Sequence, residues 1–437
     1  MKSVFLKTFG CQMNFYDSQV ILEQMKRCGY KETNDERAAN LIILNTCSIR
    51  AHAEERVFSK LGEIKKLKQE KKELIVGICG CMAQYHRRAL FERFKFLDFI
   101  VSPSNINRLQ NIIEEIKEDK TKVAYLGNFK NSLKNINPDK KGKVSAYLPI
   151  MFGCSNFCSY CVVPFLRGKS RSRKLKEIIK EVKELSNQGC REVVLVGQNV
   201  TFYGKDLNNE ATFSNLLKEI NSIENIKRIR FITSHPKDLS EDIINCFSKF
   251  PKVCPHIHLP IQSGSDKILS LMNRGYTIKT YQDLVEKLRK EVKNISITTD
   301  IMVGFPDETQ EDFKDTLNLV EEIKFDQAFT FKYSPRKDTL AFKMKNQVED
   351  KIAKERLQAL ITFQNKISKK NNEKYLSSIQ EVLVEGESSK YEDRLYGRTD
   401  NFKTVLFDGS KDIVGRLVKV VIVGYNMRTL KGNILND

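Results

Sequence analysis

Short apolar runs alternate with longer amphipathic segments over the first 130 residues of the chain. The short runs are rich in β-branched residues and predict strands, whereas the longer segments repeat apolar residues every three or four positions and predict helices. This alternation is typical of a parallel α/β sheet, because parallel neighbours need a crossover connection. The expected strands cover residues 4–8, 41–45 and 73–78, and the expected helices cover residues 17–28, 53–68 and 84–91.

The same alternation returns after a polar stretch. Residues 128–143 are rich in Asn and Lys and predict a linker. Beyond it, amphipathic segments such as 174–188 and 309–323 separate six further apolar runs. Six β/α units in a row predict an open (β/α)6 partial TIM barrel with its functional groups at the carboxyl ends of the strands. The expected strands cover residues 146–152, 192–196, 228–233, 256–261, 297–302 and 327–333.

The end of the chain has a different pattern. A helical segment over residues 348–375 leads into three β-rich runs, 381–385, 404–407 and 417–423, with glycines between them. Short strands separated by glycines predict a small antiparallel β-barrel. The fold class is therefore α/β with a small C-terminal β-barrel. We expect a first domain over residues 1–130, a linker over 131–143, a second domain over 144–373 and a third over 374–437.

Length and cysteine usage indicate the cellular environment. The chain has 437 residues and eleven cysteines, an odd number, and it begins without an apolar segment that has a charged front. A long chain of this kind needs no disulfide framework, so we expect a reduced, cytoplasmic protein. The longest apolar stretch, residues 74–83, is much shorter than the roughly 20 residues that span a bilayer. We therefore expect no association with a membrane.

The net charge favours a polyanionic partner. The formal charge is +19 and the pI is near 9.3, and a basic protein gains affinity for nucleic acid through the release of counterions. Lysine runs such as residues 65–68 and 140–143 are equally compatible with solvated faces. Charge alone leaves both interpretations open.

Three cysteines lie close together after the first strand of the predicted barrel. Cys154, Cys158 and Cys161 form a C-x3-C-x2-C motif with no fourth cysteine nearby. A structural zinc site usually closes with four protein ligands, whereas an iron–sulfur cluster held by three cysteines leaves one iron open. Such an iron can chelate the amino and carboxylate groups of a small molecule. The alternative is a zinc site completed by His235 or His258.

A second set of cysteines is spread over the first domain. Cys11, Cys47 and Cys81 each follow the end of a predicted strand. Since parallel strands bind ligands at their carboxyl edge, these three side chains are expected to meet at one point. Three thiolates without a fourth again indicate a cluster with an open iron. Cys79 is expected to be a buried thiol, because alternation along the strand points it into the sheet.

The residues around these cysteines resemble a known family. The first domain reads TFGCQMN at residues 8–14, NTCSIR at 45–50 and GICGCMAQ at 77–84. Together with the C-x3-C-x2-C motif, these motifs resemble the methylthiotransferase family of the radical S-adenosylmethionine (SAM) superfamily over essentially the whole chain. Residues 12–14, 48–50 and the VGQNV segment 196–200 are most similar to the branch that acts on prenylated adenosine in tRNA.

The resemblance implies an architecture and a chemistry. It implies a methylthiotransferase domain with an auxiliary cluster, a radical SAM core and a C-terminal TRAM domain that binds RNA. It further implies two [4Fe-4S] clusters on the six cysteines. One cluster binds SAM, which is cleaved to a 5′-deoxyadenosyl radical, and the other supplies sulfur that a second SAM methylates. The expected product carries a methylthio group on C2 of N6-(dimethylallyl)adenosine at position 37 of tRNA.

Partners and alternatives follow from the same resemblance. The chemistry implies an electron donor such as flavodoxin or ferredoxin, and a sulfur source. The same machinery could act on an aspartate of a ribosomal protein or on threonylcarbamoyladenosine in tRNA. A third hypothesis is a non-catalytic iron–sulfur sensor that binds RNA.

Polar residues at the predicted strand ends are the remaining site candidates. Tyr160 occupies the aromatic position that contacts adenine in the family that the chain resembles. Amide, hydroxyl and carboxylate groups at strand ends suit the polar groups of SAM, although a helix cap or a turn explains each of them equally well. No catalytic residue is assigned beyond the cluster ligands. The candidate cofactor ligands are Gln198, Asn199, Ser234, Gln262, Ser263 and Asp300, and the candidate RNA or substrate contacts are Arg336, Arg394, Arg398 and Arg416.

Overall fold

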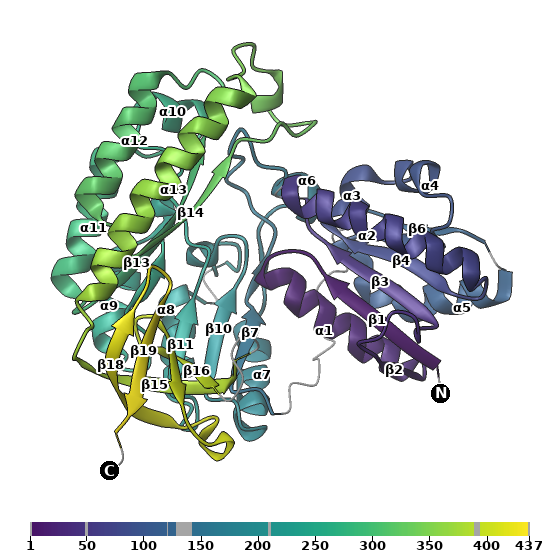
Figure 1. Ribbon diagram of the computed structural model, residues 1–437, viewed down its shortest axis with the longest axis horizontal. Helices are drawn as coiled ribbons and strands as arrows, with labels where there is room; N and C mark the ends of the chain where they lie inside the picture. The colour runs from purple at the N-terminus through teal and green to yellow at the C-terminus, as the bar shows by residue number, and fades with distance from the viewer. Residues whose placement is uncertain are drawn as a thin grey trace. The chain divides into compact units, whose positions relative to one another are not determined.

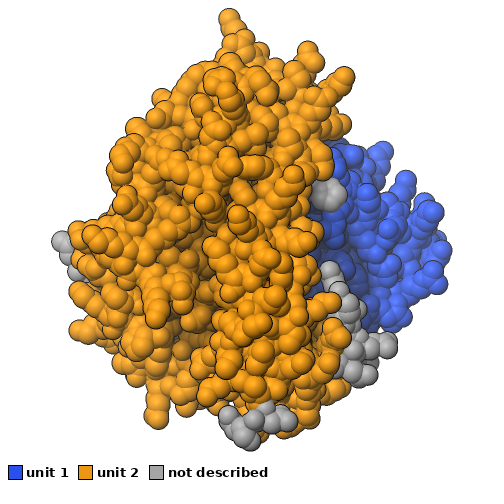
Figure 2. Space-filling view, turned by 60° about the vertical axis from the view of Figure 1, so that its left-hand side comes forward, with its two compact units in different colours: residues 1–139, 152–155, 161–173 blue, residues 140–151, 156–160, 174–437 orange. Residues whose placement is uncertain are grey.

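The computed structural model describes residues 2–48, 51–119, 121–127, 142–208, 211–388 and 394–435. It divides into two compact units, coloured separately in Figure 2. The first unit contains residues 1–139, 152–155 and 161–173, and the second contains residues 140–151, 156–160 and 174–437. Most of the expected linker lies outside the described residues, as do Ile49 and Arg50 of the second cysteine motif.

The first unit contains a parallel sheet of six strands in the order β2-β1-β3-β4-β5-β6 (Figure 1). The central strand β3 is buried along its whole length, as expected for a sheet covered on both faces. Helices α1 and α5 pack on one face, and α2, α3 and α4 pack on the other. The elements are β1 Lys2–Thr8, α1 Gln12–Arg27, β2 Tyr30–Glu32, β3 Leu41–Thr46, α2 Ala51–Glu70, β4 Ile75–Gly80, α3 Cys81–His86, α4 Ala89–Arg93, β5 Phe99–Val101, η1 Pro103–Arg108, α5 Leu109–Asp119 and β6 Val123–Tyr125.

Two predicted helices of this unit differ from the structure. The helix expected from residue 17 begins at Gln12, because Cys11 and Asn14 form a capping box there. The single helix expected over residues 84–91 is wrong. It is divided into α3 and α4 because Arg87 leaves the helical conformation, with φ +52° and ψ −141°, and this ends α3.

The second unit contains the predicted open (β/α)6 partial barrel, named the half-open barrel from here on. Its six parallel strands follow one another in chain order as two three-stranded sheets, β7-β10-β11 and β12-β13-β14, with helices outside them. One continuous core of aliphatic and aromatic residues fills the space between strands and helices. Along the chain, α6 Val163–Arg167 and β9 Arg171–Ser172 belong to the first unit, and β8 Met151–Phe152 has Met151 in the second unit and Phe152 in the first. The other elements are β7 Ser145–Pro149, α7 Leu175–Asn187, β10 Glu192–Val196, η3 Val200–Phe202, α8 Phe213–Asn221, β11 Arg228–Phe231, η4 Pro236–Asp238, α9 Glu241–Lys249, β12 His256–His258, α10 Asp266–Leu271, α11 Ile278–Glu291, β13 Ser296–Val303, α12 Gln310–Ile323, β14 Gln327–Lys332 and η5 Ala341–Lys343.

The small C-terminal barrel is closed, with strand order β15-β16-β17-β19-β18. The prediction of a purely antiparallel barrel is wrong, because β19 returns antiparallel to β18 and closes the barrel by pairing parallel to β17. Strands β16 and β19 were not predicted, because each is short and contains a glycine and at least one charged residue among few apolar ones. The elements are α13 Asp350–Glu373, β15 Ile379–Glu387, β16 Arg394–Thr399, β17 Thr404–Asp408, η6 Lys411–Ile413, β18 Leu417–Tyr425 and β19 Thr429–Ile434.

Buried arginines attach the C-terminal barrel to the half-open barrel. Arg230 pairs with Glu192 at 2.6 Å and donates to the Thr399 carbonyl at 2.6 Å. Arg228 donates to the Glu381 carbonyl at 3.0 Å. Glu192 and Arg228 are the first residues of β10 and β11. The C-terminal barrel is therefore anchored at the amino ends of these strands, opposite the edge at which the candidate cofactor ligands were predicted.

Candidate active site

Cys11, Cys47 and Cys81 lie at the carboxyl edge of the sheet in the first unit. Cys11 is the N-cap of α1, Cys47 directly follows β3, and Cys81 is the first residue of α3. Their strands β1, β3 and β4 are neighbours in the sheet. Cys47 is hydrogen-bonded to Cys11, and Cys11 acts electrostatically on Cys81. The fold thus brings the three side chains together, while their role as cluster ligands stays a prediction.

Two glycines and two asparagines fix the backbone around these cysteines. Asn14 donates its side-chain amide to the Thr46 carbonyl at 3.0 Å, and Asn45 donates to the Asn14 carbonyl at 2.8 Å. A Cβ at Gly10 would collide with the Asn14 side chain. A Cβ at Gly80, whose φ is +97°, would collide with the Thr46 carbonyl. The three motifs of the first domain therefore interlock at one edge of the sheet.

The thiols of this unit differ in their protonation. A hydrogen bond with Cys47, assisted by the positive charge of Arg167, lowers the pKa of Cys11 to about 6 against the opposing effect of burial. Burial raises the pKa of Cys81, and Arg167 opposes this change. Cys79 is fully buried in the hydrophobic core, and burial strongly raises its pKa. The expectation that Cys79 is a packed thiol is confirmed, whereas Cys11 is available as a thiolate near neutral pH.

The donor set of the first unit fits an iron–sulfur cluster. Within the described ranges, no three His, Cys, Asp or Glu side chains are grouped as the ligands of one metal ion would be. The three ligands of a cluster bind three different iron atoms, so they are spaced more widely than the ligands of a single ion. The three neighbouring thiols, of which Cys11 has a lowered pKa, fit the chemistry of such a cluster, because thiolates are the ligands that iron–sulfur clusters prefer.

The other three cysteines lie in a loop between β8 and α6. In the second unit, the Ser159 amide donates to the Met272 carbonyl at 3.0 Å, and its hydroxyl donates to the Leu271 carbonyl at 2.8 Å. The Ser159 carbonyl accepts the Ala341 amide at 2.9 Å. These bonds hold the loop although it has no regular secondary structure. The half-buried cysteines of the loop are Cys154, Cys158 and Cys161.

A buried arginine contacts this loop. Arg274 places Nη1 3.4 Å from the Cys158 sulfur and 3.5 Å from the Tyr160 hydroxyl. Its Nη2 donates to the Pro260 carbonyl at 2.8 Å, and its Nε donates to the Tyr276 hydroxyl at 2.9 Å. Arg274 therefore brings a buried positive charge next to a candidate cluster ligand. The same contacts place the candidate adenine-binding ring of Tyr160 beside Cys158.

Two candidate cofactor ligands have buried polar atoms that are available to hydrogen-bond a bound ligand. Ser234 Oγ and Gln262 Oε1 are buried and have no hydrogen-bond partner within the described part of the chain. The Gln262 backbone is fixed, because its amide donates to the Asp300 carbonyl at 2.9 Å and its carbonyl accepts the Met302 amide at 2.8 Å. Its φ is +73°, a strained value for a residue with a side chain. These residues therefore fit a polar ligand such as SAM.

The other candidate cofactor ligands already have partners in the protein or local roles. The Asn199 amide donates to Asp238 at 2.6 Å, and its oxygen accepts the Thr201 hydroxyl at 2.8 Å. Ser263 is buried and accepts the Ser265 amide at 3.2 Å in a turn. These bonds fit the local alternative of a cap or turn residue for Asn199 and Ser263, and their role as cofactor ligands stays a prediction. Two further candidates complete the set. Gln198 is half-buried two residues beyond the end of β10, and Asp300 lies inside β13 with Oδ2 3.4 Å from His258 Nε2.

The four candidate arginines for RNA lie in different environments. Arg398 donates from Nη1 to both carboxylate oxygens of Glu385 at 2.6 and 2.7 Å, which gives it a structural role, and its predicted RNA contact stays a prediction. Arg394 is partly exposed and pairs with Asp408 at 3.2 Å, whereas Arg416 is exposed. Arg336 is buried four residues beyond the end of β14. Arg416 is the candidate most accessible to a phosphate.

Sequence reasoning did not single out Arg167 and Arg274, the two buried arginines beside the cysteine sets. Arg167 contacts Cys81 across 86 positions of sequence, and Arg274 contacts Cys158 across 116 positions. Neither arginine is close in the sequence to the cysteine that it contacts. The available signal was weak: each arginine directly precedes a glycine in a segment that is otherwise apolar or uncharged.

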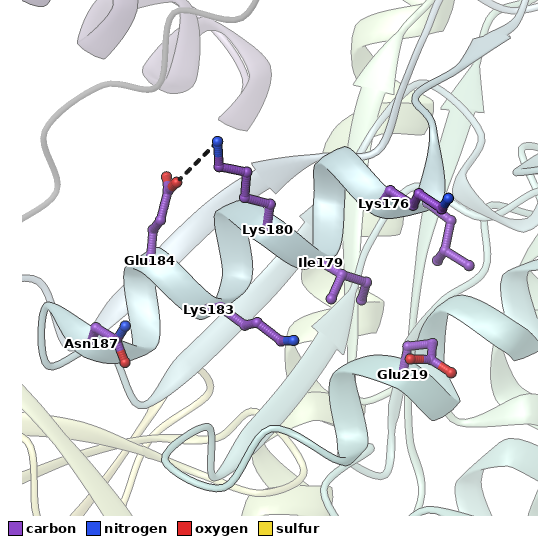
Figure 3. A pocket seen from close by; sticks show the side chains of 8 residues that line it. Lys176, Ile179, Lys180, Lys183, Glu184, Asn187 and Glu219 are labelled. Atoms are coloured by element: carbon purple, nitrogen blue, oxygen red, sulfur yellow. Dashed lines mark ion pairs between the residues drawn. The ribbon is translucent and has the colours of Figure 1, made fainter.

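A surface groove of about 450 Å³ lies on the outer side of α7 (Figure 3). Lys176, Lys180 and Lys183 line it, Lys180 pairs with Glu184 at 4.0 Å, and Glu219 of α8 lies on its other side. All of its lining residues belong to these two helices. Since no strand end contributes to it, the groove is separate from the candidate cofactor ligands.

Three family models match the chain. The first, described as Uncharacterized protein family UPF0004, covers residues 3–102, the Radical SAM superfamily covers residues 148–320, and the TRAM domain covers residues 373–435. Solved structures agree in fold. TsrM, a radical SAM methyltransferase from Kitasatospora setae, superposes with a TM-score of 0.57 at 15% identity over 78% of this chain and 75% of that chain.

Curated relatives are similar over nearly the whole length. A tRNA-2-methylthio-N(6)-dimethylallyladenosine synthase from Carboxydothermus hydrogenoformans is 45% identical over 434 residues, covering 99% of each chain. The protein of the same name from Clostridium tetani is 44% identical over 431 residues, covering 98% of this chain and 95% of that one. The chain therefore belongs to the tRNA-2-methylthio-N6-dimethylallyladenosine synthase family of radical SAM enzymes.

Proposed function

We propose that this enzyme adds a methylthio group to C2 of N6-(dimethylallyl)adenosine at position 37 of tRNA. Its family uses SAM and an iron–sulfur cluster. The observation that carries the proposal is the second set of thiols, since Cys11, Cys47 and Cys81 meet at one sheet edge in addition to the C-x3-C-x2-C loop. A radical enzyme without sulfur insertion would need only the loop.

The two sets of residues divide the work. When bound, the loop cluster with SAM supplies the radical, and the N-terminal cluster supplies the sulfur. In this proposal, Cys154, Cys158 and Cys161 hold the first cluster, and Cys11, Cys47 and Cys81 hold the second. Ser234 and Gln262 orient SAM through their buried, unpartnered oxygens. Tyr160, kept beside Cys158 by Arg274, contacts the adenine.

The C-terminal barrel is proposed to bind the tRNA. Arg416 supports this role because it is exposed, and Arg394 is partly exposed. Arg336 is proposed to contact the substrate base from its position beyond β14. Domain limits at residues 1–130, 144–373 and 374–437, with a linker over 131–143, complete the assignment. Since α13 leads directly into β15, the last limit lies where the helix ends.

Further partners follow from the chemistry. Reductive cleavage of SAM needs an electron, so the proposal includes a donor such as flavodoxin or ferredoxin. Continued turnover also needs a sulfur source for the N-terminal cluster. No helix in the described part of the chain is long and apolar enough to cross a membrane. A cytoplasmic location, where tRNA and these donors are found, is part of the proposal.

Anaerobic reconstitution followed by nucleoside mass spectrometry tests the proposal. The chain is loaded with iron and sulfide and incubated with SAM, a reductant and prenylated tRNA. We expect two clusters per chain and the 2-methylthio product, and tRNA without the prenyl group serves as the matched control. Absence of 5′-deoxyadenosine would instead favour the sensor hypothesis. Product on threonylcarbamoyladenosine tRNA or on a ribosomal protein alone would move the activity to those substrates.

A further inference from the structure

Arg167 lies beside the thiols of the first unit. It ends the short helix α6, which begins two residues after Cys161. Its Nη2 donates to the Asp17 carboxylate at 2.8 Å, and both side chains are at least nine-tenths buried, with exposed fractions of 6% and 9%. The guanidinium also forms a side-chain hydrogen bond with Cys81. Its positive charge therefore lies within the N-terminal thiol site.

The packing around α6 holds this arrangement. Val162 and Leu166, on either side of the first turn, pack against Cys81 in a small apolar cluster. Asp17, from α1, ties the guanidinium to the helix that Cys11 caps. Arg167 is thus fixed from two directions, and breaking a buried pair of this kind leaves a charge without a partner. These contacts hold the guanidinium beside Cys81.

We propose that Arg167 is a positioning residue of the N-terminal thiol site, where it holds Cys81 and offsets the negative charge of the thiolates, so that a cluster bound there is more easily reduced. Hydrogen bonds to the sulfur ligands and the net charge near a cluster set its reduction potential. One-electron reduction makes the cluster more negative, so a nearby cation favours the reduced form. Asp17 limits this effect because it carries the opposite charge.

The inference rests on the N-terminal cluster of the proposed function. It is tested by redox titration, followed by electron paramagnetic resonance, in the full chain carrying Cys154→Ala, Cys158→Ala and Cys161→Ala. Any remaining cluster in this parent chain belongs to the N-terminal site. Arg167→Gln should shift its potential to a more negative value, and Asp17→Asn should shift it to a more positive value. Arg167→Lys, which keeps the charge, should restore most of the parent potential.

Opposite shifts distinguish this role from a merely structural one, because both substitutions break the same ion pair and would damage the fold alike. Arg356→Gln is the matched control, since Arg356 forms a buried pair with Glu308 at 2.7 Å in the second unit. It should leave the potential unchanged. Equal potentials in all variants, or shifts in the same direction for Arg167→Gln and Asp17→Asn, would overturn the inference.

The remaining outcomes are also decisive. If Arg167→Gln does not retain iron, Asp17→Asn and Arg167→Lys carry the test, and a potential in Asp17→Asn that is not raised overturns the inference. If the parent chain itself holds no cluster, iron and sulfide counting shows that the proposed second cluster is wrong, and the inference falls with it. If the cluster is present but its potential is unchanged in Arg167→Gln and Asp17→Asn, the inference about Arg167 is wrong while the proposed second cluster stands.

Discussion

The two cysteine sets have similar surroundings but differ in how far apart their cysteines lie in the sequence. Cys11, Cys47 and Cys81 are separated by more than 30 residues each and come together because three parallel strands end at one edge. The three cysteines of the barrel loop lie within eight residues and need no sheet to bring them together. In both sets a buried arginine contacts one of the cysteines, Arg167 at Cys81 and Arg274 at Cys158.

The two sets therefore depend on different contacts to keep their cysteines in place. The distributed set depends on interlocked backbone, in which Gly10, Gly80, Asn14 and Asn45 fix how the strand ends meet. The local set has its spacing built into the chain and depends on bonds that hold one loop, such as those of Ser159. Substitutions in the scaffold should therefore affect the first set more than the second.

The largest expected effect comes from removing each set of cysteines in turn. Changing Cys154, Cys158 and Cys161 to Ala should abolish cleavage of SAM to 5′-deoxyadenosine while iron remains at the N-terminal site. Chromatography of the nucleoside products and iron counting measure these outcomes. Loss of all iron would contradict the assignment of two separate sites.

The complementary variant removes the distributed set. Changing Cys11, Cys47 and Cys81 to Ala should preserve cleavage of SAM and stop methylthiolation, as measured by mass spectrometry of digested tRNA. The two triple variants serve as controls for each other, because each retains the other site. Continued formation of the methylthio product would remove the proposed role of the N-terminal site.

A second prediction concerns the arginine of the barrel loop. Arg274→Gln removes the cation beside Cys158, and loss of such an outer partner typically lowers metal affinity or activity by about 10- to 100-fold. The rate of SAM cleavage should fall by this factor, while the N-terminal cluster keeps its potential. Arg274→Lys should recover part of the rate. A cleavage rate equal to that of the unsubstituted enzyme would show that Arg274 only packs.

A third prediction compares the two scaffolds directly. Asn14→Ala removes the buried amide that donates to the Thr46 carbonyl at 3.0 Å and to Asn45 Oδ1 at 3.3 Å, which should cost about 1–3 kcal/mol. Ser159→Ala removes one hydrogen bond to the Leu271 carbonyl and should cost about 1 kcal/mol. Hydrogen exchange of β3 amides and of the barrel loop measures the two effects. A larger loss for Ser159→Ala would reverse the proposed contrast.

The smallest expected effect lies outside both cysteine sets. Arg416→Gln should weaken tRNA binding a few-fold and lower the salt dependence by about one phosphate contact, since Arg416 is exposed. Cleavage of SAM without tRNA should stay unchanged in this variant. Arg398→Gln is the informative comparison, because loss of its pair with Glu385 should lower stability instead. Equal salt slopes for Arg416→Gln and the unsubstituted enzyme would exclude the contact.

Much of the fold was accessible from the sequence. Six barrel strands, the alternation of the first unit and the long helix α13 were predicted because each has a strong local period. The break between α3 and α4 and the strands β16 and β19 were not predicted. The positive φ of Arg87 has no sequence signal, and the two strands are short, with few apolar residues to form a periodic pattern. The parallel pairing of β17 with β19 depends on closure of the barrel, which no local pattern encodes.

The sequence by itself determined which thiols lie near one another. Cysteines within one loop are close because the chain connects them, and cysteines that follow strands of one parallel sheet are close because those strands end at the same edge. Only the tertiary structure decided which other groups face them. Packing between segments far apart in the chain places Arg167, Asp17 and Arg274 near the cysteines. It also gives the Asn199 side chain a hydrogen-bond partner, whereas the Ser234 hydroxyl has none among the described residues. Partners of this kind follow from burial and long-range geometry, for which no spacing rule exists.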